Sequence, residues 1–109
     1  MFPMPNWPLL RVAIAAESMA PTLSDGEWWI ARRTRKCRPG DVVVFDHPTR
    51  SGMVAVKRVI RPEGDGWWVE GDNPEHSTDS RHFGPLPRAR VLGRLVWRYS
   101  PWPPRRLTR

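Results

Sequence analysis

The chain has 109 residues, of which 39% are hydrophobic, and a formal net charge of +7 from 18 Lys and Arg against 11 Asp and Glu. That length allows one compact domain and leaves no room for a second. The single cysteine, Cys37, excludes an intrachain disulfide and fits a reducing compartment. The 13 prolines and 8 glycines favour short strands and tight turns over long helices.

The first apolar run, residues 9–16, is too short for a membrane span, which needs roughly 20 apolar residues. Arg11 interrupts this run, and three prolines precede it, which argues against a signal peptide. We therefore expect no transmembrane anchor and a cytoplasmic protein.

The remaining pattern predicts an all-β domain with a Pro-rich arm before it and an Arg-rich tail after it. Strands of this length and spacing favour a single curled antiparallel sheet or a partly open barrel. We expect turns at 24–26, 38–41, 49–52 and 63–66, with Asp65-Gly66 supplying positive φ in the last. The predicted parts are an arm at 1–8, a domain at 9–102 with strands at 9–16, 27–32, 42–45, 53–60, 67–70 and 91–99, and a mobile tail at 103–109.

One long segment, residues 71–87, is polar and shows almost no periodicity. Loops of this length are uncommon inside so small a domain and usually carry function. We therefore expect this segment to contribute to a site.

Lys57 is unusual because the chain has sixteen arginines and only one other lysine, Lys36. It lies in a predicted strand, on the same face as Ala55 and Val59. Burial lowers a lysine pKa and can leave a neutral amine that acts as a general base, which arginine cannot do. Taken alone, such a lysine more often extends along an edge strand to solvent.

Ser18 directly follows the first predicted strand, where a nucleophile can be exposed and still rigidly supported. Met19 would anchor the turn in the core, and Pro21 would stiffen it. The backbone N–H of Ser18 could then bind an oxyanion.

Three segments together resemble the sequence boxes of type I signal peptidases and related Ser–Lys peptidases. Residues 18–23, Ser-Met-Ala-Pro-Thr-Leu, are similar to the nucleophile box, and residues 56–59, Val-Lys-Arg-Val, to the base box. Residues 71–73, Gly-Asp-Asn, followed by Ser-Thr-Asp-Ser-Arg at 77–81, are similar to the third box. The resemblance covers residues 9–102 and implies the curled sheet of the signal peptidase and repressor protease type.

The resemblance implies that Ser18 is the nucleophile and Lys57 the general base of a serine endopeptidase that needs no metal or cofactor. Ser77 would hydrogen-bond the Lys57 amine and orient it. The supporting residues that it implies are the ion pair of Asp79 with Arg81 and a turn formed by Gly71, Asp72 and Asn73. Some relatives have an oxyanion-donating hydroxyl two residues before the nucleophile, where this chain has Ala16.

The substrate that the resemblance suggests is an N-terminal leader on a precursor protein. Self-cleaving relatives cut an Ala-Gly or Cys-Gly bond, and neither dipeptide occurs here. Residues 66–73 and 91–99 look most like the compact peptidases that mature nickel-type superoxide dismutase, so that precursor is the expected partner. The alternative is signal-peptidase-like processing of other exported or membrane precursors.

A different class of function, a basic nucleic-acid-binding β module, is suggested by the charge and the seven tryptophans, but no recognised binding motif accompanies them. The spacing of His47, His76 and His82 fits no common zinc pattern. Neighbouring positive charges predict a lowered pKa for Cys37. Residues 67 and 68, both Trp, should place one ring in the core and one outside, near a substrate groove.

Overall fold

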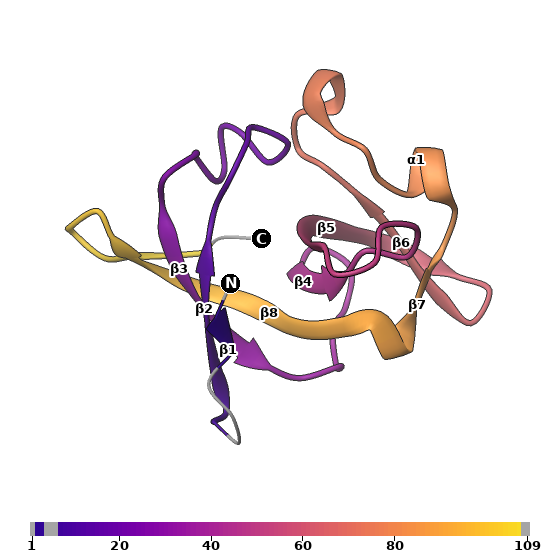
Figure 1. Cartoon of the computed structure of the whole chain (residues 1–109), viewed down its shortest axis with the longest axis horizontal. Coiled ribbons are helices and arrows are strands. Elements are labelled where there is room, and N and C mark those ends of the chain that lie inside the picture. Colours follow the sequence, from indigo (N-terminus) through magenta and orange to yellow (C-terminus); the bar gives the residue numbers. More distant parts are fainter. Residues whose placement is uncertain (1, 4–6, 108–109) are drawn as a thin grey trace.

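The computed structural model describes residues 2–3 and 7–107, which form one antiparallel sheet that is not closed into a barrel (Figure 1). The strand order is β1-β2-β3-β8-β4-β5-β6-β7, with β9 beside β8. Figure 1 shows β8 crossing the molecule and joining the β1-β2-β3 half to the β4-β5-β6-β7 half. The strands are β1 (Phe2–Pro3), β2 (Leu9–Ala13), β3 (Trp28–Arg33), β4 (Val42–Asp46), β5 (Val54–Glu63), β6 (Gly66–Glu70), β7 (Leu86–Pro87), β8 (Val91–Ser100) and β9 (Arg105–Arg106).

The predicted all-β class is confirmed, and the predicted turn at residues 38–41 precedes β4. Asp41 N–H donates to the Arg38 carbonyl at 3.0 Å, and Gly40 has a φ of 96°, as expected for a Pro-Gly turn. The strand after it, β4, is apolar on both faces because the curled sheet covers both. Val42 and Val44 enter one core cluster, and Val43 and Phe45 enter the other.

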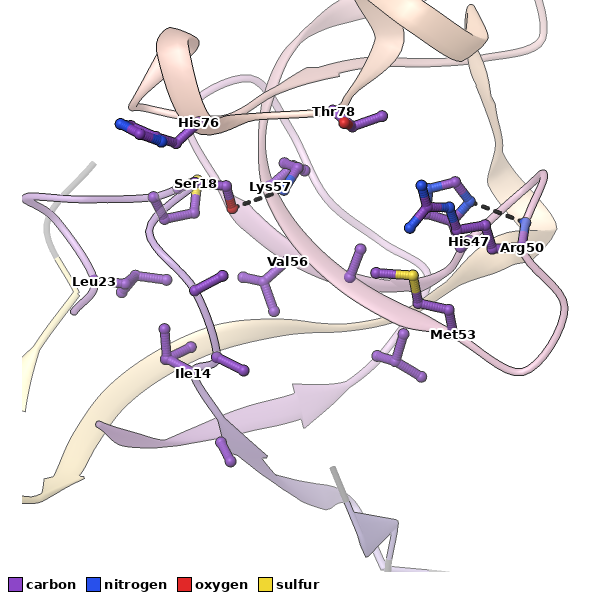
Figure 2. A pocket seen from close by; sticks show the side chains of 16 residues that line it. Ile14, Ser18, Leu23, His47, Arg50, Met53, Val56, Lys57, His76 and Thr78 are labelled. Atoms are coloured by element: carbon purple, nitrogen blue, oxygen red, sulfur yellow. Dashed lines mark hydrogen bonds between the residues drawn. The ribbon is translucent and has the colours of Figure 1, made fainter. Parts of the chain in front are cut away.

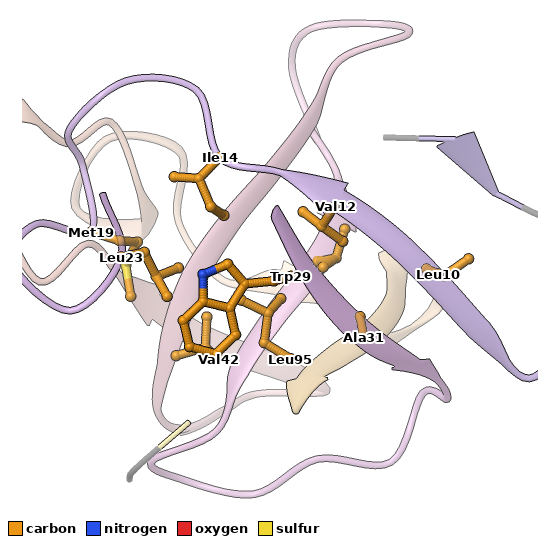
Figure 3. Close-up of a cluster of buried hydrophobic side chains, with 10 residues drawn as sticks. Leu10, Val12, Ile14, Met19, Leu23, Trp29, Ala31, Val42 and Leu95 are labelled. Atoms are coloured by element: carbon orange, nitrogen blue, oxygen red, sulfur yellow. The ribbon is translucent and has the colours of Figure 1, made fainter. Parts of the chain in front are cut away.

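The first core cluster lies under β2 and β3 and includes residues from the loop of residues 14–27, here called the Ser18 loop. Trp29 is fully buried at its centre, with Val12 on one side (Figure 3). Met19 and Leu23 of the Ser18 loop pack on the other side and are 2% and 0% exposed. This packing anchors the loop, and the predicted role of Met19 as an apolar anchor is confirmed.

The last predicted turn was wrong in detail. The two turn residues are Gly64 and Asp65, and the positive φ, 57°, belongs to Gly64. Gly66 begins β6 instead, where a Cβ atom would meet the backbone carbonyl of Leu86 on β7. Gly66 is therefore required for a close approach of two strands, not for a left-handed conformation.

The segment of residues 71–87 is not the structureless loop that its lack of periodicity predicts. It contains a 3₁₀ turn η1 (Pro74–His76), a one-turn helix α1 (Ser80–Phe83) and the strand β7, and a further 3₁₀ turn η2 (Arg88–Arg90) follows. Asp79 caps α1 by accepting the Arg81 N–H at 3.2 Å. Elements of three or four residues are too short to produce a period.

The described part of the predicted tail, residues 103–107, contacts the domain. Residues 105 and 106 form β9, which pairs with Trp97 and Arg98 of β8, and Leu107 packs against the first core cluster. At the other end, residues 2 and 3 of the predicted arm pair with β2, while residues 1, 4–6 and 108–109 lie outside the described residues. Among the helices of the described residues, none is long and apolar enough to cross a membrane.

Candidate active site

The Ser18 loop leaves β2 through a strained turn. Ile14 continues the ladder, since its N–H donates to the Glu27 carbonyl at 2.8 Å. Two residues on, Ala16 has a φ of 77°, a left-handed conformation that costs a residue with a Cβ about 1 kcal/mol. The carboxylate of Asp25 holds it there by accepting the Ala16 N–H at 2.9 Å. Ser18 follows this turn and is half-buried.

Lys57 lies in β5 opposite Val43 of β4, and its side chain is 7% exposed. Its Nζ lies 2.7 Å from Ser18 Oγ, so the fold joins two residues that are 39 positions apart in the chain (Figure 2). Burial lowers the pKa of Lys57 below its ordinary value of 10.5, although the negative charge of Asp79 opposes the shift. The arrangement is a hydroxyl in contact with a buried amine whose pKa is lowered.

The expected hydrogen bond between Ser77 and Lys57 is not present among the described residues. Ser77 Oγ donates instead to Asp79 Oδ2 at 2.6 Å. A serine hydroxyl has one hydrogen, so towards Lys57 it could only accept. Ser77 and Asp79 are buried, at 8% and 0% exposure. Ser77 therefore supports the carboxylate whose charge acts on Lys57.

Asp79 is held by several donors at once. Its Oδ1 accepts from Arg81 Nε at 2.9 Å and its Oδ2 from Arg81 Nη2 at 2.7 Å, which is the ion pair that the sequence predicts. The Gly71 N–H also donates to Oδ2, at 2.8 Å. Burial alone would raise the pKa of Asp79, but hydrogen bonds from Arg81, Ser77 and Gly71 reverse this and hold it well below its usual range.

Asp72 joins the Ser18 loop to the strand of Lys57. Its carboxylate accepts from Arg58 Nε and Nη2, both at 2.9 Å, and from Thr22 Oγ1 at 2.6 Å. Burial would raise the pKa of Asp72, but these hydrogen bonds lower it. Arg58 also donates to the Gly40 carbonyl at 2.7 Å.

Gly71 and Asn73 hold the third box, residues 71–73, closely against the backbone of Ser18. The Asn73 N–H donates to the Ser18 carbonyl at 2.9 Å, and its side-chain amide donates to the Glu17 carbonyl at 3.1 Å. A Cβ on Gly71 would collide with the Ser18 carbonyl oxygen and with the Ser77 hydroxyl. The third sequence box thus supports the backbone of the Ser18 loop.

A pocket of about 240 Å³ opens beside Ser18 and Lys57 (Figure 2). Two chain segments form its walls, residues 13–16 after β2 and residues 53–57 at the start of β5. Residues 54–57 pair with β4 on one side, and the β6 ladder on the other side begins only at Arg58. One edge of early β5 is therefore unpaired among the described residues.

Two other sequence predictions are corrected, those for Cys37 and for the tryptophan pair, and the structure also places the three histidines. Burial, followed by the charge of Asp41, raises the pKa of Cys37 to about 11, although Arg88 and Arg94 oppose the shift. Trp67 is buried and Trp68 half-buried as expected, but neither lines the pocket beside Ser18. The histidines are divided between two places, because His47 and His76 line that pocket whereas His82 accepts the Asp79 N–H at 3.3 Å.

Sequence reasoning missed several residues of the site. Thr22 and Arg58 lie inside the recognised boxes, but their shared partner Asp72 is 50 and 14 positions away, which no local pattern reveals. Asp25 appears in the sequence only as a turn residue. His47 lies just before the turn predicted at residues 49–52 and Arg50 lies within it, and no spacing assigns either residue to the pocket.

Comparison with known proteins identifies the family. The profile of the family described as Peptidase S24-like matches residues 7–96. Mitochondrial inner membrane protease subunit 1 of Schizosaccharomyces pombe is 34% identical over 113 residues, covering 78% of this chain and 71% of that protein. Mitochondrial ATP-independent inner membrane protease subunit 1b of Arabidopsis thaliana is 33% identical, covering 67% of this chain and 56% of that protein.

A third relative, the probable thylakoidal processing peptidase 2 of Arabidopsis thaliana, is 29% identical, covering 88% of this chain and 39% of that longer protein. The predicted resemblance to signal-peptidase-like enzymes is confirmed at the level of the family. With most of its length matched by the family profile and a 34% identical protease as a relative, the chain belongs to the Peptidase S24-like family.

Proposed function

We propose that this peptidase is a serine endopeptidase in which Ser18 is the nucleophile and Lys57 the general base. The observation that supports this most is the 2.7 Å contact between Ser18 Oγ and the buried Lys57 Nζ at the wall of a pocket. The lowered pKa of Lys57 favours the neutral amine, which can take a proton, and the hydroxyl in contact with it is the group to be activated.

The proposed reaction uses these positions. Ser18 Oγ attacks the substrate carbonyl carbon while its proton passes to Lys57 Nζ, and the resulting oxyanion accepts the Ser18 N–H. This N–H has no hydrogen-bond acceptor among the described residues. Lys57 then protonates the leaving amine, and the C–N bond breaks to leave an acyl-enzyme. Water, deprotonated by Lys57, hydrolyses that ester and restores the Ser18 hydroxyl.

The substrate backbone would bind as an added strand. The unpaired edge of residues 54–56 faces the pocket, and an extended peptide can satisfy such an edge with main-chain hydrogen bonds. Ile14, Met19, Leu23 and Val56 give the pocket an apolar wall, and His76 lies beside Ser18 (Figure 2). A pocket of about 240 Å³ admits a small apolar side chain there.

The substrate class is a precursor protein with an N-terminal leader. The relatives named as a processing peptidase and as inner membrane proteases favour precursors other than nickel superoxide dismutase. The dismutase precursor remains the finer hypothesis and rests on the sequence resemblance alone. The cytoplasmic location remains a prediction as well.

The test is to incubate the protein with a nickel superoxide dismutase precursor and, separately, with a leader-bearing precursor of an exported protein. The new N-terminus is read by mass spectrometry. Ser18→Ala removes the nucleophile, and Ser24→Ala, an exposed serine in the same loop, is the matched control.

One cut at the leader junction by the wild type and Ser24→Ala, absent with Ser18→Ala, supports the proposal. A cut in the exported precursor alone rejects the dismutase hypothesis, and a cut in the dismutase precursor supports it. Cleavage that survives in Ser18→Ala contradicts the assigned nucleophile. If the folded wild type cuts neither precursor, leader processing is rejected.

A further inference from the structure

The pocket beside Ser18 has two chemically different ends. Ile14 and Leu23 form an apolar end, whereas His47 and Arg50 lie together at the opposite end, with Met53 beside them (Figure 2). The proposed acyl transfer uses neither His47 nor Arg50. A polar, positively charged end of a substrate pocket is suited to bind a polar or negatively charged group of the substrate.

His47 is fixed in one orientation. It is 5% exposed, and its ring packs edge-on against Phe83 with 5.3 Å between the ring centroids. Its Nδ1 accepts the backbone N–H groups of Thr49 at 3.2 Å and Arg50 at 3.1 Å. The His47 backbone is held too, because its N–H donates to the Met53 carbonyl at 2.8 Å.

These contacts determine which ring nitrogen carries the hydrogen. Burial, followed by the charges of Arg50 and Lys57, lowers the pKa of His47, so the ring is neutral near pH 7. Backbone N–H groups can only donate, so Nδ1 is the acceptor and Nε2 bears the hydrogen. No described residue accepts a hydrogen bond from Nε2. His47 therefore offers an N–H donor at the pocket wall.

Arg50 adds a positive charge beside that donor. Its side chain is exposed, and no carboxylate among the described residues forms an ion pair with it. By contrast, Arg58, Arg81 and Arg98 each pair with an aspartate or glutamate. A guanidinium next to an imidazole N–H is a suitable pair of donors for the two oxygens of a carboxylate.

We propose that His47 and Arg50 form a subsite for an acidic side chain, Asp or Glu, of the polypeptide substrate. The inference rests on the proposed peptidase function and extends it to substrate choice. Met53 lies just before β5 and four residues before Lys57, which corresponds to about 13 Å of extended chain. A peptide paired along this edge therefore carries the acidic residue about four positions from the cleaved bond.

The first experiment measures binding without cleavage. Peptides spanning a leader junction, each with Asp or Asn at one position within five residues of the cut, are titrated into Ser18→Ala by fluorescence anisotropy. At one position about four residues from the cut, Asp should bind about fivefold more tightly than Asn, as expected for an ion pair with one exposed partner. Equal affinities at every position would overturn the proposal.

The second experiment exchanges the charges. In the Ser18→Ala background, Arg50→Glu should abolish the preference for Asp and favour a Lys peptide at the same position. Arg35→Glu makes the same charge change at an exposed residue that does not line the pocket, and it should keep the preference for Asp. If Arg50→Glu and Arg35→Glu change the preference for the Asp peptide equally, the preference reflects net charge alone. That result would reject the subsite.

Cleavage then separates this inference from the proposed function. If the wild type cuts the Asp peptide about fivefold faster in kcat/KM than the Asn peptide, and Arg50→Glu reverses the order, the subsite also selects substrates. Equal rates for both peptides would reject selection by the subsite and leave the peptidase function intact. No cleavage of either peptide, with selective binding preserved, would reject the peptidase function and leave the binding subsite intact.

Discussion

Among single residues, the proposed general base depends on a chemical difference between lysine and arginine. The chain uses arginine for sixteen of its eighteen basic residues, yet a lysine occupies the buried position beside Ser18. A guanidinium keeps its proton in any protein environment, whereas burial lowers the pKa of a lysine. Only the lysine can supply a neutral nitrogen at this position.

We predict that Lys57→Arg lowers kcat/KM by a factor of ~10³ or more, because the guanidinium cannot accept the Ser18 proton. The measurement is the rate of leader cleavage by a variant whose circular dichroism shows a retained fold. Lys36→Arg, at the only other lysine, is the matched control and should keep its activity. A Lys57→Arg enzyme as active as that control would contradict the assigned base.

The pH dependence has a defined sign. Lys57 must be neutral to act, so kcat/KM rises as the pH increases through its pKa, which lies below 10.5. The charge of Asp79 raises that pKa, so Asp79→Asn should move the rising part of the profile to lower pH. Asp46→Asn, at an exposed carboxylate, should leave the profile in place. If the rising part of the Asp79→Asn profile moved to higher pH, the result would contradict the assignment of Lys57 as the base acted on by Asp79.

The same pKa has a consequence for stability. Between the lowered pKa of Lys57 and 10.5, the unfolded chain binds this proton and the folded chain does not. The free energy of unfolding therefore gains a contribution from Lys57 that increases with pH across this window. Below the window the buried ammonium costs its full desolvation, and above it the cost disappears.

At the scale of elements, the segment of residues 71–83 holds the Ser18 loop and β5 together. Asp72 reaches Thr22 in the loop and Arg58 in the strand, while Asn73 and Gly71 contact the Ser18 backbone. The 2.7 Å contact of Ser18 with Lys57 depends on both parts keeping their relative positions. This segment therefore acts on catalysis through positioning.

We predict that Gly71→Ala destabilises the fold by about 1–3 kcal/mol and also lowers kcat of the folded enzyme, since the new methyl group displaces Ser18 and Ser77. Gly64→Ala is the control. Its φ of 57° costs about 1 kcal/mol in the β5–β6 turn, where no atom lies within 4 Å of the added methyl. Measuring both thermal unfolding and kcat for each variant separates the effect on stability from the effect on catalysis. Unchanged kcat in folded Gly71→Ala would show that the contact is structural only.

The sequence predicts the elements unevenly. Strands such as β4 and β8 are marked by apolar runs between turn residues, so their existence and approximate bounds could be predicted. The one-turn helix α1 could not, because four residues carry no period. Gly66 was assigned to a turn because Asp-Gly favours one, whereas a long-range contact with β7 decides its role. Residue patterns along the chain predict turns and strands, but they do not predict contacts between strands that are distant in the sequence.

The candidate site shows the same division. Ser18 and Lys57 could be found because their boxes resemble a known family, and the structure brings their side chains into contact. The partner of Ser77 could not be predicted, since the choice between Lys57 and Asp79 depends on side-chain geometry. The strained φ of Ala16 depends on a hydrogen bond to Asp25, nine positions away.

At the scale of the whole molecule, the site lies where the two halves of the curled sheet meet. The Ser18 loop belongs to the half formed by β2 and β3, whereas Lys57 belongs to β5 in the other half (Figure 1). The C-terminal strand β9 adds a contact across the chain, because Arg105 Nη2 donates to the Thr22 carbonyl at 2.7 Å. Residues near the end of the chain thus stabilise the loop that carries Ser18.

We predict that Arg105→Ala lowers the free energy of unfolding by about 0.5–1 kcal/mol and lowers kcat/KM a few-fold, because the Ser18 loop loses one support. Arg106→Ala removes the same charge from the next residue of β9, whose side chain has no hydrogen bond or ion pair among the described residues, and should change neither quantity. Chemical denaturation and cleavage rates provide the measurements. If both variants changed stability and kcat/KM equally, the effects would come from the lost charge and not from the hydrogen bond to Thr22.

The most direct test of the central claim, that Ser18 attacks the substrate with Lys57 as base, is to trap the acyl-enzyme. The wild type is mixed with a precursor peptide, quenched with acid at short times, and analysed by intact-mass and peptide mass spectrometry. We predict an adduct with the mass of the leader on Ser18, absent from Ser18→Ala and from Lys57→Arg. Cleavage that proceeds without any such adduct, or an adduct on another residue, would contradict the claim.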